Sequence, residues 1–313
     1  MRFLEIFWQC LSKMNEAFPI TEGFIPFRGY RVWYRIVGDS EETGKKPLLC
    51  LHGGPGIPHD YLEPIGEMAA SGRRVIFYDQ LGCGNSDHPH NPNMWTVELF
   101  LAEIDTIRRS LRLECVHILG QSWGCMLAME YALTRPPGLT SMILSDPIAD
   151  MHQWVDEANR LRAELPREVQ QTLWKYERAG TTEAPAYQEA VLAYYRRHLC
   201  RLKEWPECLN RSFEKLKQYP EVYYTMNGPS EFHVIGTLRN WSIVDRLDEI
   251  RVPTLLLSGR YDEATPAIVR TISRGIAGSE WVMFENSAHM PHLEEPNRYS
   301  QALNDFLTRV EKT

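Results

Sequence analysis

A serine between two glycines is the feature of this sequence most suited to chemistry. Residues 120–124 read Gly-Gln-Ser-Trp-Gly, the pattern G-x-S-x-G. The apolar run 116–119 predicts a buried strand before it, and residues 126–133 predict a helix after it. In this context of strand, sharp turn and helix, the pattern exposes a nucleophilic hydroxyl. We therefore expect Ser122 to be a catalytic nucleophile, and the alternative is an ordinary turn in which the serine caps the helix.

A serine hydroxyl needs a base to accept its proton, and the base needs an acid to orient it. A predicted strand over 254–258 leads into Asp262, and a second over 281–284 leads into His289. Because parallel strands end at the same edge of a sheet, both side chains are expected beside the serine. The chain order serine, acid, histidine is the one that accompanies a G-x-S-x-G turn in α/β sheets. We expect Ser122, Asp262 and His289 to form a catalytic triad.

Other residues compete for these two roles. His292 lies just past the loop of His289, and Asp245 and Asp248 precede the predicted strand at its other end. Asp262 also suits a turn, and His289 an ordinary loop.

A glycine-rich loop follows the predicted strand 47–51. Residues 52–56 read His-Gly-Gly-Pro-Gly, and two glycines before a proline suit a loop that presents backbone N–H groups to a ligand. Together with the serine turn, this predicts an oxyanion hole made by the N–H groups of Gly54 and Trp123. A plain turn is the alternative.

The surrounding elements predict an α/β fold. Segments 23–27 and 30–37 favour an opening antiparallel hairpin, and strands then alternate with helices, which indicates a mostly parallel, doubly wound sheet. From Pro147 onward the short apolar strands give way to helical stretches, which predicts an inserted helical cap. The expected division is a peripheral extension over 1–18, an α/β core over 19–146 and 246–313, and a cap over 147–245.

Composition limits the function classes. The chain has 313 residues, 43% of them hydrophobic and 24% charged, which is typical of a soluble globular protein with a full core. The net charge of −7 argues against non-specific binding to nucleic acid or to an anionic membrane. No apolar run is long enough to predict a transmembrane span. No cluster of His, Asp and Glu has metal-ligand spacing, so we expect neither a metal nor a cofactor.

The cysteines predict a reducing compartment. Their number, seven, is odd, and none forms a C-x-x-C pair. Cys50 and Cys115 lie in apolar, strand-like runs, which predicts reduced core thiols of a cytoplasmic protein and neither a disulfide framework nor a zinc site.

Taken together, these motifs resemble the proline iminopeptidase family of α/β-hydrolases, over roughly residues 20 to 310. The resemblance implies the α/β-hydrolase fold with a helical cap, and hydrolysis of an amide bond after a residue with a free α-amino group. Segments 226–232 and 261–263 look most like the tricorn-interacting aminopeptidase and L-amino acid amidase branch. The motifs that carry the resemblance are 52–56, Asp79-Gln80-x-Gly-x-Gly-x-Ser86, 120–124, Gly259-x-Tyr261-Asp262 and His289.

The resemblance also implies a site for the substrate ammonium, made by Glu231 from the cap and Glu263 beside the predicted catalytic acid. From the residues alone, each glutamate equally suits the first turn of a helix, where a negative charge is favourable. The chain departs from the family pattern at Asn85, where many members have arginine, and at Cys125, where a second glycine often follows the serine turn. Neither departure removes a predicted catalytic group.

We therefore expect a cytoplasmic, metal-independent serine hydrolase that acts through an acyl-enzyme on L-amino acid amides or short peptides. Nucleic acid and membranes are not expected partners, and the sequence leaves the oligomeric state open. A carboxylesterase of the same fold, with no need for an ammonium group, is the main rival. A non-catalytic ligand receptor on the same fold is a remote one.

Overall fold

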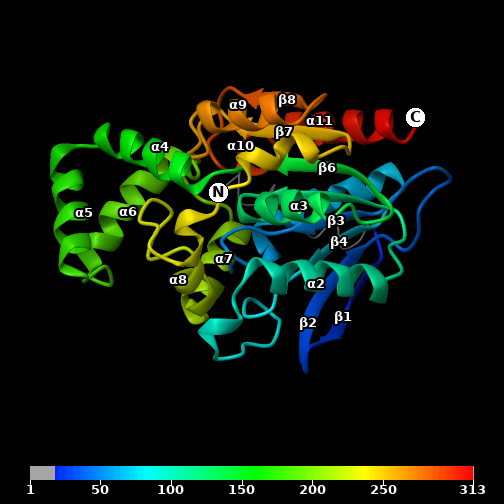
Figure 1. The fold of residues 1–313 in the computed structure, drawn as a ribbon, viewed down its shortest axis with the longest axis horizontal. Helices are drawn as coiled ribbons and strands as arrows, with labels where there is room; N and C mark the ends of the chain where they lie inside the picture. Colours follow the sequence, from blue (N-terminus) through cyan, green and yellow to red (C-terminus); the bar gives the residue numbers. More distant parts are fainter. Residues whose placement is uncertain (1–17, 313) are drawn as a thin grey trace.

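The computed structural model describes residues 18–312. The predicted extension over 1–18 therefore lies, apart from Phe18, outside the described residues. Within them the chain forms one eight-stranded sheet in the order β1-β2-β4-β3-β5-β6-β7-β8 (Figure 1). The strands are β1 (Ile20–Phe27), β2 (Tyr30–Val37), β3 (Leu48–Leu51), β4 (Val75–Tyr78), β5 (Val116–Gln121), β6 (Leu139–Ser145), β7 (Thr254–Gly259) and β8 (Glu280–Phe284).

The sheet is antiparallel at one edge and parallel elsewhere. β1 and β2 form the predicted hairpin, and β2 pairs antiparallel with β4. All other pairs, from β4 and β3 through to β7 and β8, are parallel. The prediction of an α/β-hydrolase fold with a mostly parallel, doubly wound sheet is confirmed.

Alternate residues of each central strand enter two separate cores. In β3, Leu49 and Leu51 pack into one core, whereas Leu48 and Cys50 pack into the other. Burial on both faces explains why these strands are continuous apolar runs without the alternation of a half-exposed strand. One face is covered by α2 (Val97–Ser110), α3 (Trp123–Leu133) and α9 (Pro266–Gly275), and the other by the 3-10 helix η1 (His59–Ser71), α10 (Pro291–Glu294) and α11 (Pro296–Val310).

Helices without strands occupy the segment predicted to be the cap. They gather beyond one end of the sheet (Figure 1). They have an apolar cluster of their own, which includes Leu161, Leu173 and Tyr194. These helices are α4 (Met151–Ala163), α5 (Arg167–Ala179), α6 (Pro185–His198), α7 (Glu207–Gln218) and α8 (Glu221–Met226), followed by the short 3-10 helix η3 (Thr237–Asn240). The next 3-10 helix, η4 (Val244–Glu249), lies mostly beyond this segment and packs against α9.

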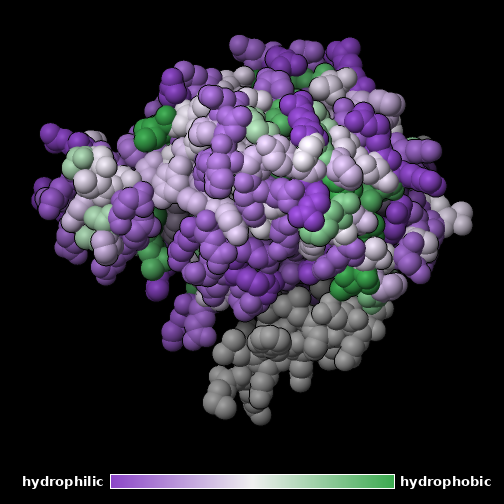
Figure 2. Space-filling model, turned by 90° about the horizontal axis from the view of Figure 1, so that it is seen from below, coloured by the Kyte–Doolittle hydropathy of each residue, from purple (hydrophilic) through white to green (hydrophobic). Residues whose placement is uncertain are grey.

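The surface carries scattered hydrophobic side chains. Trp174 and Ile235 are the most exposed large ones, at 57% and 59%. On the face shown in Figure 2, the hydrophobic residues of the described chain form small, separate patches on a mainly hydrophilic surface. Single exposed hydrophobic residues of this kind are normal for globular proteins. Within residues 18–312, no helix is both long enough and apolar enough to cross a membrane.

The described cysteines are all free thiols, but not all are in a core. Cys50 is buried in β3, as predicted. Cys115 is exposed, so its prediction as a core thiol is wrong. It precedes Val116, the first residue of β5, and therefore lies on the surface loop that leads into that strand.

Candidate active site

Ser122 occupies a strained turn between β5 and α3. Its backbone angles are φ 54° and ψ −118°, outside the regions that a serine ordinarily adopts. The flanking glycines permit the close approach of strand and helix. A Cβ on Gly120 would lie 2.2 Å from the Gly124 oxygen, and one on Gly124 would lie 2.1 Å from the Leu51 oxygen. The predicted turn is therefore present, and it holds Ser122 at the start of α3 and the carboxyl end of β5.

The structure joins the other two predicted triad members. His289 Nδ1 lies 2.6 Å from Asp262 Oδ1, and both side chains are buried. The same Asp262 oxygen accepts the Ala264 N–H at 2.7 Å. Gln121, next to Ser122, donates to the His289 carbonyl at 3.1 Å, so the histidine loop is tied to the serine turn. Among the described residues, the Ser122 hydroxyl itself makes no hydrogen bond to His289; such bonds are often long in unliganded sites.

Burial sets the protonation of this pair. It lowers the pKa of His289, which leaves the imidazole neutral and able to accept a proton. Burial also raises the pKa of Asp262, although hydrogen bonds from Asp146 and from backbone N–H groups oppose that rise. The competing residues are placed elsewhere. His292 is buried and bonded through Nε2 to the Tyr61 carbonyl at 3.0 Å, and Asp245 and Asp248 lie on η4 before β7.

A small cavity brings Gly54, Trp123 and Ser122 together. It is narrow, with an accessible volume of about 10 Å³, and lies between the sheet edge and the cap. Tyr61 fixes the glycine loop, because its hydroxyl accepts the Gly53 N–H at 2.8 Å and donates to Gln121 at 2.6 Å. The other lining residues are Pro55, Met126, Ile148, Met151, Trp154, Asn227, Glu231 and Leu238.

Glu231 reaches this cavity from the cap. It lies in a turn after α8 and not at a helix start, so the helix-start interpretation of this residue is wrong. Its carboxylate accepts the Tyr223 hydroxyl at 2.6 Å, and its backbone carbonyl accepts the Trp154 indole N–H at 2.7 Å. Burial raises the pKa of Glu231, which the Tyr223 hydrogen bond partly offsets.

Glu263 is the most unusual ionisable group of the site. It is fully buried, and neither carboxyl oxygen has a hydrogen-bond partner within the described chain. One oxygen lies 4.0 Å from His289 Nε2. Burial raises its pKa well above the usual range, and the nearby carboxyls of Glu231 and Asp262 raise it further. Glu263 comes two residues before Thr265, the N-cap of α9. It therefore lies before the first turn of the helix, and its side chain is buried in the site.

Asp146 is a buried acid of this site that the sequence analysis did not single out. It follows β6 directly, and its carboxyl lies within 4.8 Å of Asp262 and His289. Its position at the carboxyl end of a parallel strand is the signal that identified Asp262. The same argument applied to β6 finds it.

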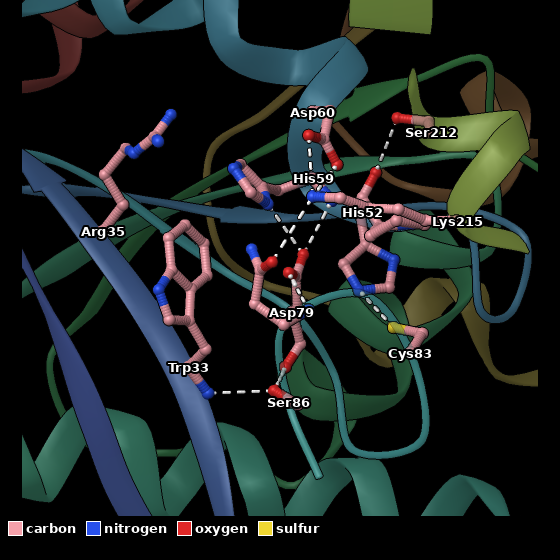
Figure 3. Close-up of polar contacts among 12 residues, drawn as sticks. Trp33, Arg35, His52, His59, Asp60, Asp79, Cys83, Ser86, Ser212 and Lys215 are labelled. Carbon is pink, nitrogen blue, oxygen red and sulfur yellow. Dashed lines mark hydrogen bonds and ion pairs between the residues drawn. The ribbon is translucent and has the colours of Figure 1, made fainter. Parts of the chain in front are cut away.

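A second polar cluster includes His52, His59, Asp60 and Asp79 and reaches Lys215 of the cap (Figure 3). His59 Nδ1 lies 2.7 Å from Asp79 Oδ1, and His52 Nε2 accepts the Gln80 N–H at 2.9 Å. From the cap helix α7, Lys215 lies 2.8 Å from Asp60. These and neighbouring contacts join the loops after β3 and β4 to the cap.

This cluster includes three potential metal ligands, His59, Asp60 and Glu63. Its carboxylates already carry cations, because Arg211 pairs with both Asp60 and Glu63 and Arg35 lies 2.7 Å from Glu63. The arrangement is therefore that of an ion-pair network. Asn85, where the chain departs from the family pattern, lies at the edge of this network, with its side-chain oxygen 3.5 Å from Lys215.

Comparison with known proteins gives a consistent result. Residues 46–296 match the family described as alpha/beta hydrolase fold. The proline iminopeptidase of Clostridium botulinum is 41% identical over 294 residues, which cover 93% of this chain and 99% of the relative. The one from Saccharolobus solfataricus is 37% identical over 301 residues, covering 96% of each chain.

Solved structures agree with this result. The crystal structure of the Mycobacterium smegmatis proline iminopeptidase superposes with a TM-score of 0.87 at 38% identity, covering 93% of this chain and 99% of that one. The crystal structure of VinJ superposes with a TM-score of 0.90 at 45% identity, with the same coverage. The chain therefore belongs to the proline iminopeptidase family of α/β-hydrolases, as its motifs predict, and is an enzyme of the hydrolase class.

Proposed function

We propose that the protein is a serine aminopeptidase or amidase that cleaves the amide bond after a residue with a free α-amino group. The observation that carries this proposal is Glu263, a buried carboxyl without a hydrogen-bond partner beside His289. A buried carboxylate without a partner is strongly unfavourable, and a substrate ammonium would supply the missing charge. Relatives named proline iminopeptidase are in accord with this.

The reaction begins with the hydroxyl of Ser122. Its oxygen attacks the substrate carbonyl carbon while His289 Nε2 takes the proton, and Asp262 holds the imidazole in the required tautomer. The N–H groups of Gly54 and Trp123 stabilise the oxyanion. The C–N bond then breaks, and His289 returns the proton to the leaving amine. Water, deprotonated by the same histidine, hydrolyses the acyl-enzyme and releases the amino acid.

Glu231 and Glu263 would hold the ammonium of the first residue. Glu231 approaches from the cap and Glu263 from the loop after β7, so the ammonium would be fixed between the two parts of the chain. Holding the ammonium there would fix the distance between the amino group and the carbonyl that Ser122 attacks, so that cleavage falls after the first residue. The cavity wall formed by Met126, Ile148, Met151 and Leu238 favours a small apolar side chain on that residue.

A panel of aminoacyl amides and dipeptides, each with an N-acetylated counterpart, tests this function. We expect hydrolysis of the free amines and poor hydrolysis of the acetylated forms. Equal rates on the free amines and the acetylated forms would instead indicate that the protein is a carboxylesterase with no need for an ammonium group. A chain that hydrolyses neither, and that no serine acylating agent labels, would be a binding protein.

A further inference from the structure

Asp146 is a fully buried acid in a position that no role in the proposed reaction yet explains. It follows β6 with φ 58°, in the left-handed region that residues other than glycine enter uncommonly, although aspartate does so more often than most. Its N–H donates to the Leu257 carbonyl at 2.7 Å, which fixes the backbone against β7. No ion pair among residues 18–312 includes Asp146. A buried carboxyl without a cation is expected to keep its proton.

The contacts of the two carboxyl groups show where that proton lies. Asp262 Oδ1 is occupied by His289 and the Ala264 N–H, and Asp146 Oδ2 accepts the Ser145 hydroxyl at 2.9 Å. The remaining oxygens, Asp262 Oδ2 and Asp146 Oδ1, are buried and accept from no N–H or O–H of the described residues. One carboxyl oxygen of Asp146 and one of Asp262 lie within 4.8 Å of each other. A hydrogen bond between two carboxyl groups requires a proton on one of them.

The surroundings favour Asp146 as the group that carries the proton. Burial raises its pKa well above the usual range, and the adjacent Asp262 raises it further. Burial raises the pKa of Asp262 to about 8, and the Asp146 and backbone hydrogen bonds keep that pKa from rising further. Within residues 18–312, none of the titratable groups around Asp146 is a permanent cation. These groups are Asp262 and Glu263 after β7, His289 after β8, Cys125 in α3, Tyr61 in η1 and Tyr299 in α11.

We propose that Asp146 is a positioning residue: as a neutral carboxylic acid it donates a hydrogen bond to Asp262 Oδ2 and keeps Asp262 ionised opposite His289. The inference rests on the proposed serine hydrolase mechanism. No covalent bond changes at Asp146, and its proton stays in place through the cycle. A buried acid with only a packing role would have no influence on the ionisation of Asp262, so the pH dependence of the reaction separates the two roles.

The test compares Asp146→Asn with Asp146→Ala in kcat/KM against pH on a free aminoacyl amide. Asparagine keeps an N–H donor in a side chain of the same shape. The low-pH side of the kcat/KM profile, its acid limb, should therefore coincide in this variant and in the parent. Alanine removes the donor, which raises the pKa of Asp262. The acid limb should then move up by about 1–2 pH units, as loss of one hydrogen bond to a charged group implies. On that limb the loss in kcat/KM is about 10–100-fold.

Glu103→Gln is the matched control. Glu103 is also fully buried, burial raises its pKa to about 8, and it accepts the Leu81 N–H, away from the triad. Its replacement should leave the acid limb in place. The inference is overturned if the acid limb of the pH profile moves equally in the alanine and asparagine variants of Asp146, or if it moves in neither.

Infrared spectroscopy gives an independent readout, which also serves if the alanine variant does not fold. The difference spectrum of the parent minus Asp146→Asn at neutral pH should contain a carboxylic acid C=O band. Carboxylate bands in its place would show an ionised Asp146 and overturn the inference while the proposed function stands. A parent chain that neither hydrolyses the amide nor reacts with a serine acylating agent would overturn the proposed function itself.

Discussion

Asp262 and Glu263, neighbours in the sequence, approach opposite nitrogens of the same imidazole. Asp262 Oδ1 lies 2.6 Å from His289 Nδ1, and Glu263 Oε1 lies 4.0 Å from His289 Nε2. The first contact fixes the tautomer, which leaves Nε2 free to accept a proton. The second places an unpaired acid close to the nitrogen that would exchange protons with substrate. One loop after β7 thus contributes both to the proposed chemistry and to recognition of the substrate amine.

Replacing Ser122 by alanine should abolish hydrolysis without unfolding the chain. Removal of a triad nucleophile lowers kcat by roughly a millionfold. Rates on an aminoacyl amide, with the unfolding midpoint as control, measure the effect. A small uncharged serine acylating agent should label the parent and not the variant. EDTA should leave the parent rate unchanged; loss of activity that zinc restores would contradict the serine mechanism.

Glu263→Gln and Glu231→Gln should each lower kcat/KM on free aminoacyl amides by at least tenfold. Loss of one partner from a desolvated charge pair costs about 2–5 kcal/mol. Both variants should keep their reactivity with the serine acylating agent, because the triad is intact, and hydrolysis of N-acetylated substrates should not fall further. Glu103→Gln, a buried glutamate away from the site, serves as control. Parental rates in both variants would favour the carboxylesterase.

The KM for free aminoacyl amides should depend on pH. Because the pKa of Glu263 is raised by burial and by its acidic neighbours, the group is neutral at low pH and binds an ammonium weakly. KM should fall as pH rises and Glu263 ionises, and should rise again once the substrate amine loses its proton near about pH 8. The KM for an uncharged ester should show no such fall. A KM independent of pH for both substrates would contradict the role of Glu263.

Glu263→Gln should also stabilise the fold. A carboxyl whose folded pKa is raised favours the folded state at low pH and loses that contribution as pH rises toward the folded pKa. Glutamine is neutral at every pH, so the variant should unfold at a higher temperature than the parent at pH 8, and the difference should shrink at pH 4. Thermal unfolding at the two pH values measures this. A variant less stable than the parent at pH 8 would show that Glu263 has an unrecognised partner.

Asp60→Asn should weaken the attachment of the cap. Although burial acts to raise it, the pKa of Asp60 is lowered by His59, Lys215 and Arg211. Loss of its charge removes the carboxylate partner of Lys215 and one of the carboxylate partners of Arg211, at about 1–3 kcal/mol of unfolding free energy. Urea unfolding at pH 7 measures this effect. The control is Glu214→Gln, whose pair with Lys217 is exposed and should contribute less than about 1 kcal/mol. Equal effects of the two would contradict the structural role of this cluster.

Local patterns were sufficient for the fold and for the order along the chain of the proposed catalytic groups. The strand, turn and helix around Ser122 follow from apolar runs and from glycines whose Cβ atoms would collide with backbone. Parallel strands bring their ends to one edge, so the sequence predicts Asp262 and His289 at the edge that carries Ser122, and the structure joins these two side chains to each other. These features depend on neighbours in sequence and on the general geometry of α/β sheets.

Burial and partners between distant segments required the tertiary structure. From the residues alone, Glu231 and Glu263 suit a helix start as well as a binding site, because first-turn acids are common, and only the packing of the cap on the sheet shows both as buried. Asp146 also stands at the end of a parallel strand, so the sequence can mark its position, but its proposed role depends on the carboxyl of Asp262, a residue more than a hundred positions away. The sequence by itself determined which chemical groups stand at the ends of the strands. The tertiary structure decided which of them lose water, and desolvation is what shifts their pKa values and creates a site for a charged amine.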